Sequence, residues 1–220
     1  MSVKSTQNVR IPTALLWLGA VAALFLSVLS APTVATAATS GDSVKAISFG
    51  GTCAEDPNRR GTNKTICYAD DANMDFCTPK PWPTVYGNQL MSAMATLDSQ
   101  TDMYDTYRAT CTGQTDIGGS LNASKEISLV GTDYRGIALC TKPIGGWGKG
   151  VCDQGSLVVN TGLTGSGAQF RKTVCHEVGH FAGLHHYSAP GAIAASCMVS
   201  GSSTINSYSP AERSAINGRY

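Results

Sequence analysis

The amino-acid sequence predicts an α+β domain that disulfide bonds stabilise. A stretch with helical spacing of apolar residues comes first, several short strand-like segments follow, and a second long helical stretch comes after them. Elements grouped in this order are typical of α+β folds. The chain also contains eight cysteines, and an even number favours four disulfides in an exported protein.

Residues 1–37 have the organisation of a secretory signal peptide. Lys4 and Arg10 precede an uncharged apolar run over residues 11–31, and small residues then lead to an A-x-A pattern that ends at Ala37. The run is nearly long enough to span a bilayer, so an uncleaved anchor is the alternative. In either case residues 38–220 are exported from the cytosol, and we expect a secreted protein. Their number suits a single domain.

The charge balance excludes some classes of partner. The chain has 16 basic and 15 acidic residues, and loss of Lys4 and Arg10 with the leader takes the formal net charge from +1 to −1. A chain with so small a net charge has no strong electrostatic field that would attract nucleic acid or anionic membranes. We therefore expect a monomer with no nucleic-acid partner and no stable membrane association after the leader is cleaved.

The region before the first helix, residues 38–83, shows little periodicity and predicts an irregular segment pinned by cysteines. Asp71, Asn73 and Asp75 alternate as the oxygen ligands of a calcium loop do, but the loop's glycine and distal glutamate are missing. The sequence therefore favours a solvated acidic turn, with a Ca²⁺ site as the alternative.

The first helix is expected from Thr84, after two prolines, to about Ser99. Its apolar stripe consists of Val85, Leu90, Met91, Met94 and Leu97. Strands are then expected over residues 103–111, 126–130, 136–141 and 156–160, because glycine, aspartate and proline turns separate these runs.

Two further helices are expected in the C-terminal part. The longer runs from about Gly167 to Leu184. The shorter starts at Pro210, because Ser209 and Glu212 form a capping box and proline is favoured at the first helical position, and it extends towards Tyr220.

All four histidines of the chain lie in the longer helix or just after it, at positions 176, 180, 185 and 186. Residues four apart share a helix face, so His176 and His180 can bind one metal ion with Glu177 beside them. Gly183 lets the backbone leave the helix and bring a third imidazole, His186, to the ion. Three imidazoles with an open fourth position indicate a catalytic zinc site in which Glu177 is the general base and acid.

Neighbouring residues offer alternatives to this ligand set. H-E-x-x-H also occurs by chance in proteins without zinc. His185 could replace His186 as the third ligand, although we expect it at the exposed edge of the site. Cys175 points about 100° away from His176 on a helix, which argues against its binding the metal.

The string H-E-x-x-H-x-x-G-x-x-H from His176 to His186 resembles the signature of the metzincin zinc endopeptidases. The resemblance implies a metzincin-like fold: a small mixed twisted sheet, a long active-site helix, a methionine turn and a C-terminal helix. Met198 matches the turn methionine, with core filling as the other interpretation. Residues 173–220 are similar to the small snapalysin-type and matrixin-type enzymes, although snapalysins have aspartate where this chain has His186.

The resemblance also guides expectations for other residues. The segment Gly136–Thr141 matches by position the edge strand that pairs with extended substrates. Ser200 stands where some metzincins have a tyrosine, and Tyr208 or Tyr187 could supply a phenol to the oxyanion instead. Two disulfides are expected from the positions of the cysteines rather than from the resemblance. A bridge between Cys175 and Cys197 would clamp the floor of the site to its helix, and one between Cys140 and Cys152 would close the glycine-rich loop at residues 145–150.

The sequence thus predicts a secreted zinc metalloendopeptidase with one catalytic Zn²⁺ and protein or peptide substrates. Two other classes remain. An inactive zinc-binding relative could serve as a secreted interaction module, although the presence of Glu177 argues against it. A zinc hydrolase of small molecules would use the same metal chemistry on a shorter substrate.

Overall fold

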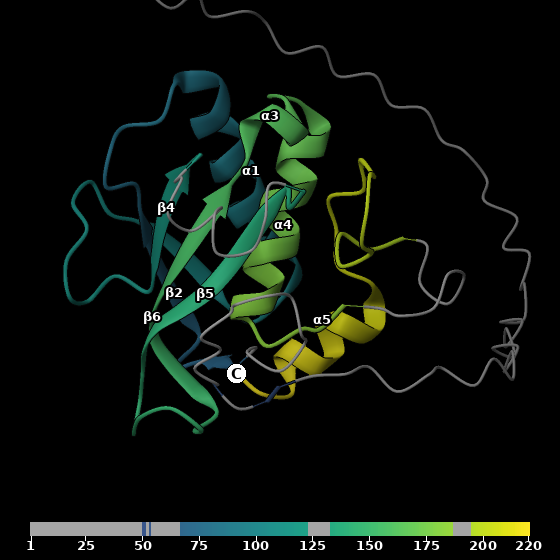
Figure 1. Ribbon diagram of the computed structural model, residues 1–220. Coiled ribbons are helices and arrows are strands. Elements are labelled where there is room, and N and C mark those ends of the chain that lie inside the picture. The colour runs from purple at the N-terminus through teal and green to yellow at the C-terminus, as the bar shows by residue number, and fades with distance from the viewer. Residues whose placement is uncertain (1–49, 52, 54–66, 123–132, 187–194) are drawn as a thin grey trace, which may run out of the picture. The chain divides into compact units, whose positions relative to one another are not determined.

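The fold places two long helices, α1 and α4, on one face of a mixed β-sheet (Figure 1). The computed structural model describes residues 50–51, 53, 67–122, 133–186 and 195–220. All of them belong to one unit, Asp42–Tyr220. The predicted signal peptide at residues 1–37 and the predicted strand at residues 126–130 lie outside the described residues.

The described elements follow the predicted order of a helix, strands and further helices. The strands are β1 (Tyr68–Ala69), β2 (Asn73–Cys77), β3 (Tyr104–Tyr107), β4 (Ile117–Leu121), β5 (Gly136–Pro143) and β6 (Val151–Val159). The helices are α1 (Thr84–Gln100), α3 (Thr161–Thr164), α4 (Ala168–Phe181) and α5 (Pro210–Asn217).

The sheet is mixed, as the resemblance implied. Its strand order is β1-β6-β4-β2-β3, with β5 also paired to β6. Every pairing is parallel except that of β5 with β6, which are joined as an antiparallel hairpin. Strands β5 and β6 both contact α4, so this antiparallel hairpin lies against the histidine-bearing helix.

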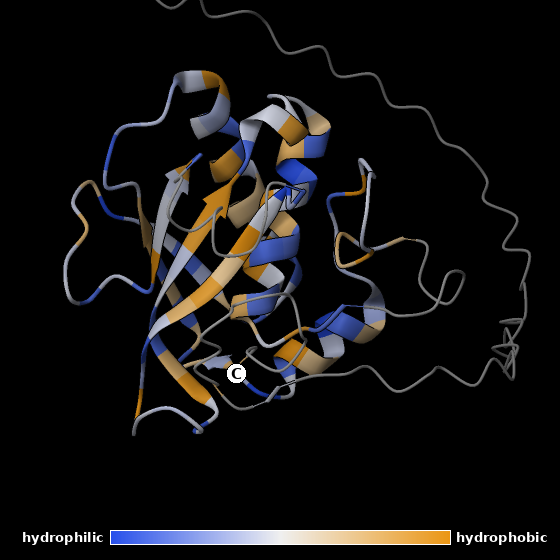
Figure 2. Ribbon diagram, viewed as in Figure 1, coloured by the Kyte–Doolittle hydropathy of each residue, from blue (hydrophilic) through white to orange (hydrophobic). Residues whose placement is uncertain are grey.

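The core lies between the sheet and the two helices. Strand β6 contributes Leu157 and Val159, which belong to the apolar end of the strand that Figure 2 shows in orange. Helix α1 contributes Leu90, Met94 and Leu97, all almost fully buried. Burial of these side chains removes apolar surface from water, which is the main force that holds helices to a sheet.

The predicted apolar stripe of α1 is only partly correct. Val85 and Met91 are 47% and 45% exposed, whereas Ala93 is fully buried and Tyr86 packs against Phe170 at the start of α4. The buried face is therefore centred on positions 86, 90, 93, 94 and 97, rotated from the expected face. Contact with α4 selects this face, and the sequence of α1 alone does not contain that contact.

The prediction of an irregular segment before residue 84 was wrong for its last part. Strand β2 occupies the interior of the sheet, between β3 and β4. Met74 and Phe76 point into the core, and Asp75 on the opposite face is buried rather than solvated. Arg108 lies 2.7 Å from the Asp75 carboxylate, so an ion pair compensates the burial of this charge.

Two strand boundaries and one further strand also differ from the prediction. Strand β3 ends at Tyr107 rather than at residue 111, because Cys111 turns back to form a disulfide with Cys77. Strand β6 begins at Val151 instead of residue 156. Strand β4 was not predicted, because its sequence IGGSL has few apolar residues; it forms through main-chain pairing with β2 and β6.

The cysteines form four disulfides, as the even count predicted. Cys140 pairs with Cys152 and Cys175 with Cys197, which confirms the two expected bridges. The others are Cys53–Cys67 and Cys77–Cys111. Cys175 is therefore not free to bind a metal. Among the described residues, no helix is long and apolar enough to cross a membrane.

Candidate metal centre

Helix α4 carries the first two candidate ligands in the interior of the protein. His176, Glu177 and His180 are 6%, 6% and 7% exposed. From Thr173 to Phe181 every residue of the helix is buried, since the sheet, α1 and the segment around Cys197 surround it. A helix so enclosed holds its side chains in fixed directions.

The rings of His176 and His180 are oriented by main-chain carbonyl groups. Nδ1 of His176 lies 2.8 Å from the carbonyl oxygen of Cys197, and Nδ1 of His180 lies 2.7 Å from that of Leu184. A carbonyl oxygen can only accept, so in both rings the proton sits on Nδ1. The lone pair of each neutral ring is therefore on Nε2, which leaves this nitrogen available to a metal.

His186 joins these two rings after a sharp turn. Gly183 has a φ of +98°, a conformation that glycine adopts without steric cost, and the chain reverses there after the end of α4. Nε2 of His186 lies 2.9 Å from Nε2 of His180. One nitrogen from each of His176, His180 and His186 lies within 4.8 Å of the others, so the three could hold a single ion.

His185 takes a different direction from the triad. Its Nε2 donates a hydrogen bond to the carbonyl oxygen of Gly50, and it is half-buried rather than exposed as expected. The alternative in which His185 replaces His186 does not match this arrangement.

Burial keeps the three imidazoles neutral. Loss of solvation lowers the pKa of His180 to about 3 and holds the pKa of His176 well below 6.5; it also lowers the pKa of His186. The neighbouring imidazoles add to this effect, since each disfavours a positive charge on the next. Neutral imidazole is the form that binds transition metals, so the site is ready for a cation without loss of protons.

Glu177 lies between the helix and strand β5. Burial raises the pKa of its carboxyl group to about 8, although the Lys172 ammonium and a backbone hydrogen bond with Ala138 of β5 act in the opposite direction. The carboxylate also approaches Gly136: a β-carbon at that position would lie 2.8 Å from Oε1 of Glu177. A carboxyl group with a pKa near neutrality can both take up and release a proton.

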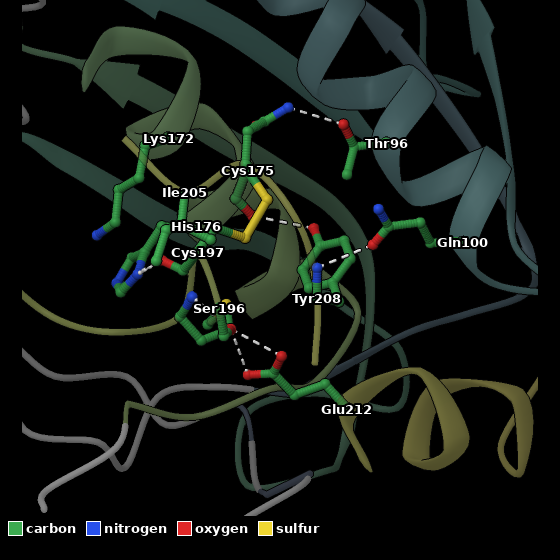
Figure 3. Close-up of a disulfide and its surroundings, with 12 residues drawn as sticks. Thr96, Gln100, Lys172, Cys175, His176, Ser196, Cys197, Ile205, Tyr208 and Glu212 are labelled. Carbon is green, nitrogen blue, oxygen red and sulfur yellow. Dashed lines mark hydrogen bonds between the residues drawn. A yellow bond between two sulfur atoms is a disulfide. The ribbon is translucent and has the colours of Figure 1, made fainter. Parts of the chain in front are cut away.

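The segment around Cys197 lies against His176 (Figure 3), and we call residues 196–198 the floor of the site. The Cys175–Cys197 disulfide joins it to α4, and Met198 is fully buried with its sulfur against Gly179. Ser196 accepts a hydrogen bond from the N–H of Met198 and donates to the carboxylate of Glu212 in α5. Glu212 also completes the predicted capping box with Ser209, so α5 is tied directly to the floor.

Tyr208 does not supply a phenol to the site. Its hydroxyl donates to the carbonyl oxygen of Cys175 at 2.9 Å, and the side chain is 2% exposed below the helix. The alternative in which Tyr208 supplies a phenol is therefore wrong, because its hydroxyl satisfies a buried carbonyl group. Tyr187, the other candidate, lies outside the described residues.

Lys172 is a charged residue near the triad that sequence analysis did not select. It is 3% exposed, and its ammonium donates to the carbonyl oxygens of Val199 and Gly201 at 2.5 and 3.3 Å. Burial lowers the pKa of Lys172 to about 8. A lysine within an otherwise buried helix was the one sign in the sequence that this side chain has a specific role. Its hydrogen-bond partners could not be identified from the sequence, because they lie 27 and 29 residues away along the chain.

The donor set fits zinc. Three neutral nitrogen donors in a mostly buried site, each of the two helical rings fixed by a carbonyl group, match the ligand chemistry of a zinc site with an open position. Among the described residues a second group has the required proximity, the sulfur atoms of Cys53, Cys67 and Cys140, but all three are in disulfides and offer no thiolate. Asp71, Asn73 and Asp75, the ligands of the alternative Ca²⁺ site, belong to neither group.

Comparison with known families agrees with the geometry. Residues 72–187, more than half of the chain, match the family described as metallo-peptidase family M12B, reprolysin-like. No curated protein matches the chain. The narrower likeness to snapalysin-type or matrixin-type enzymes is not confirmed by this match, whereas the metzincin-related family and fold are. Taken with the histidine triad at the end of helix α4, the match shows that this chain belongs to the reprolysin-like M12B family of metallopeptidases.

Proposed function

We propose that the protein is a secreted zinc endopeptidase in which His176, His180 and His186 bind the metal through Nε2. The observation that carries the proposal is the convergence of three neutral imidazoles beside one buried glutamate. A zinc ion bound there supplies Lewis acidity, which acidifies water and polarises a peptide carbonyl group.

Glu177 is the proposed general base and acid. Its carboxylate takes a proton from the water that attacks the peptide carbonyl carbon, and the C–N bond then breaks as the same proton passes to the departing nitrogen. Burial raises the pKa of the Glu177 carboxyl group to about 8, and a cation bound beside it would lower that pKa towards the ionised form that accepts the proton. The backbone hydrogen bond with Ala138 orients the carboxyl group along strand β5.

Strand β5 is the proposed contact for an extended substrate. It is antiparallel to β6 and contacts helix α4. Main-chain pairing with such a strand provides affinity without strong dependence on substrate side chains. Met198, held by Ser196 and packed on Gly179, gives the triad a rigid floor.

Secretion is proposed from the leader-like sequence at residues 1–37 and from the four disulfides, which form and persist in oxidising compartments. The mature protein isolated from culture medium should begin at Ala38 by mass spectrometry. Protein retained in the membrane with residues 11–31 intact would instead support the anchor.

The central test is Glu177→Gln. This variant should bind one zinc ion per chain, as the wild type does, and lose casein hydrolysis by a factor of about 10² or more. Unchanged hydrolysis would contradict the assigned role of Glu177. A wild-type protein that binds zinc but cleaves no protein, and instead binds a partner equally well with either residue, would favour the interaction module.

Peptides of graded length separate an endopeptidase from a small-molecule hydrolase. An endopeptidase that pairs its substrate with β5 should need several residues on each side of the bond, and kcat/KM should rise with peptide length. Equal rates on short acyl amides and on long peptides would favour the small-molecule hydrolase.

A further inference from the structure

A short segment near residue 50 lies against the chain that leads to His186. The N–H of Gly50 donates to the carbonyl oxygen of Gly183 at 2.7 Å, and the carbonyl oxygen of Gly50 accepts a hydrogen bond from Nε2 of His185. We call Gly50, Gly51 and Cys53 the strap. We propose that the strap positions the imidazole of His186 by holding Gly183 and His185, an inference that rests on the proposed metal site.

His186 differs from the other two imidazoles in what determines its place. His176 and His180 belong to a buried helix, and a carbonyl group fixes each ring. His186 comes after the helix has ended, beyond the turn at Gly183, so the path of the backbone decides where its ring lies. The strap bonds to the residue at this turn and to the residue immediately before His186.

The contact requires glycine at position 50. Gly50 has a φ of +77°, and a β-carbon there would lie 1.9 Å from the hydroxyl oxygen of Tyr68 in β1. No other residue type adopts this conformation and also leaves room for the tyrosine ring. With glycine, both the N–H and the carbonyl oxygen of residue 50 reach the chain before His186.

The other end of the strap is anchored to the loop between β5 and β6. The N–H of Cys53 donates to the carbonyl oxygen of Lys149 at 2.5 Å, and the carbonyl oxygen of Cys53 accepts from Gly148 at 2.8 Å. The Cys53–Cys67 disulfide fixes the same residue covalently. Because this end cannot drift, the hydrogen bonds of Gly50 restrain Gly183 and His185 relative to the sheet.

The hydrogen bond from His185 can be removed and restored by substitution. His185→Leu removes the donor, whereas His185→Gln offers an N–H at the same number of bonds from Cα as Nε2 of the histidine. We expect the dissociation constant for Zn²⁺, measured by competition with a chromogenic chelator, to rise about 10-fold or more in the leucine variant, as loss of a group that orients a ligand does. The glutamine variant should recover most of the affinity.

The Gly50 contact has a matched control in Gly165, which follows α3. Both glycines have positive φ, but a β-carbon at Gly165 meets nothing within 4 Å. Gly50→Ala should weaken Zn²⁺ binding about 10-fold, and Gly165→Ala should leave it unchanged. Thermal unfolding of the metal-free proteins shows whether each variant folds; if Gly50→Ala does not, the two His185 variants carry the test.

The visible absorption of bound Co²⁺ reports the ligand geometry directly. We expect His185→Leu to alter the intensity of the Co²⁺ bands and His185→Gln to restore them, which a change in stability alone would not do. A wild-type protein that binds Zn²⁺ no better than His180→Ala would overturn the metal site itself. Wild-type affinity and an unchanged Co²⁺ spectrum in both His185→Leu and Gly50→Ala, with His180→Ala impaired, would overturn only the role of the strap.

Discussion

The sulfur of Met198 occupies the space that a side chain at Gly179 would need. A β-carbon on Gly179 would lie 2.4 Å from Sδ of Met198 and 3.0 Å from the ring of Tyr208. Gly179 immediately precedes the candidate ligand His180. Any larger residue at position 179 would push Met198 away from helix α4. The metal-binding helix and the methionine turn are therefore parts of one packed unit.

Gly179→Ala tests this packing. Alanine is favoured over glycine inside a helix by about 1 kcal/mol, but overpacking a buried contact costs about 1–3 kcal/mol. We expect the free energy of unfolding to fall, as measured by urea denaturation of the metal-free protein. Gly87→Ala in α1 is the control, because its β-carbon would meet nothing within 4 Å, and it should be neutral or stabilising. Equal stability of the two variants would show that the floor moves aside freely.

Ser196→Ala tests the connection between α5 and the floor. Ser196 is fully buried, and its hydroxyl links the N–H of Met198 to the carboxylate of Glu212. Its removal leaves a buried carboxylate with fewer donors, which should cost about 1–3 kcal/mol of unfolding free energy. Ser202→Ala, at an exposed residue whose hydroxyl meets Arg135, should change stability by less than about 0.5 kcal/mol. Similar losses in both variants would contradict the special role of Ser196.

Gly136→Ala tests the approach of strand β5 to Glu177. The added β-carbon would lie 2.7 Å from Thr173 Cγ2 and 2.8 Å from Glu177 Oε1, so the carboxylate or the strand must shift. We expect kcat for peptide hydrolysis to fall about 10-fold or more while zinc content stays at one ion per chain. Gly118→Ala in β4 is the matched control, since its nearest neighbour would be 3.8 Å away. An unchanged kcat in Gly136→Ala would argue against a fixed position for Glu177.

The carboxyl group of Asp116 makes stability depend on pH. Burial raises the pKa of Asp116 from 3.8 to about 7, and the nearby carboxylates of Asp70 and Asp75 add to the rise. Between these pH values the folded state holds a proton that the unfolded state has lost. The contribution of Asp116 to stability should therefore be greatest below about pH 4 and fall as pH rises towards 7. The three buried imidazoles act in the opposite direction, because their lowered pKa values make folding less favourable as pH falls below about 6.5.

Asp116→Asn should reduce this dependence. The free energy of unfolding of the wild type relative to the variant, measured by urea denaturation at several pH values, should fall as pH rises from 4 to 7. Some slope should remain in the variant, because burial raises the pKa of Asp70 and Asp105 as well. A variant with the full wild-type slope would show that Asp116 is not the main source.

Local sequence patterns predicted some elements correctly. The capping box of Ser209 and Glu212 depends on residues three apart, and α5 begins where it indicates. The spacing of His176 and His180 depends on the helix repeat alone, and the structure brings their rings together with that of His186. Strands β2 and β4 were missed because their stability comes from neighbours on both sides, whereas their own sequences are short and partly polar.

The sequence by itself indicated the candidate residues for the chemistry: four histidines in one stretch, a glutamate beside the first of them, and a glycine where the chain must turn. Only the tertiary structure decided that His186 rather than His185 joins the triad, that Tyr208 supports the helix from below, and that Gly50 reaches the loop before His186. The physical reason is that the helix repeat alone determines which side chains within one turn lie next to each other. Contacts between distant segments depend instead on how the whole chain packs.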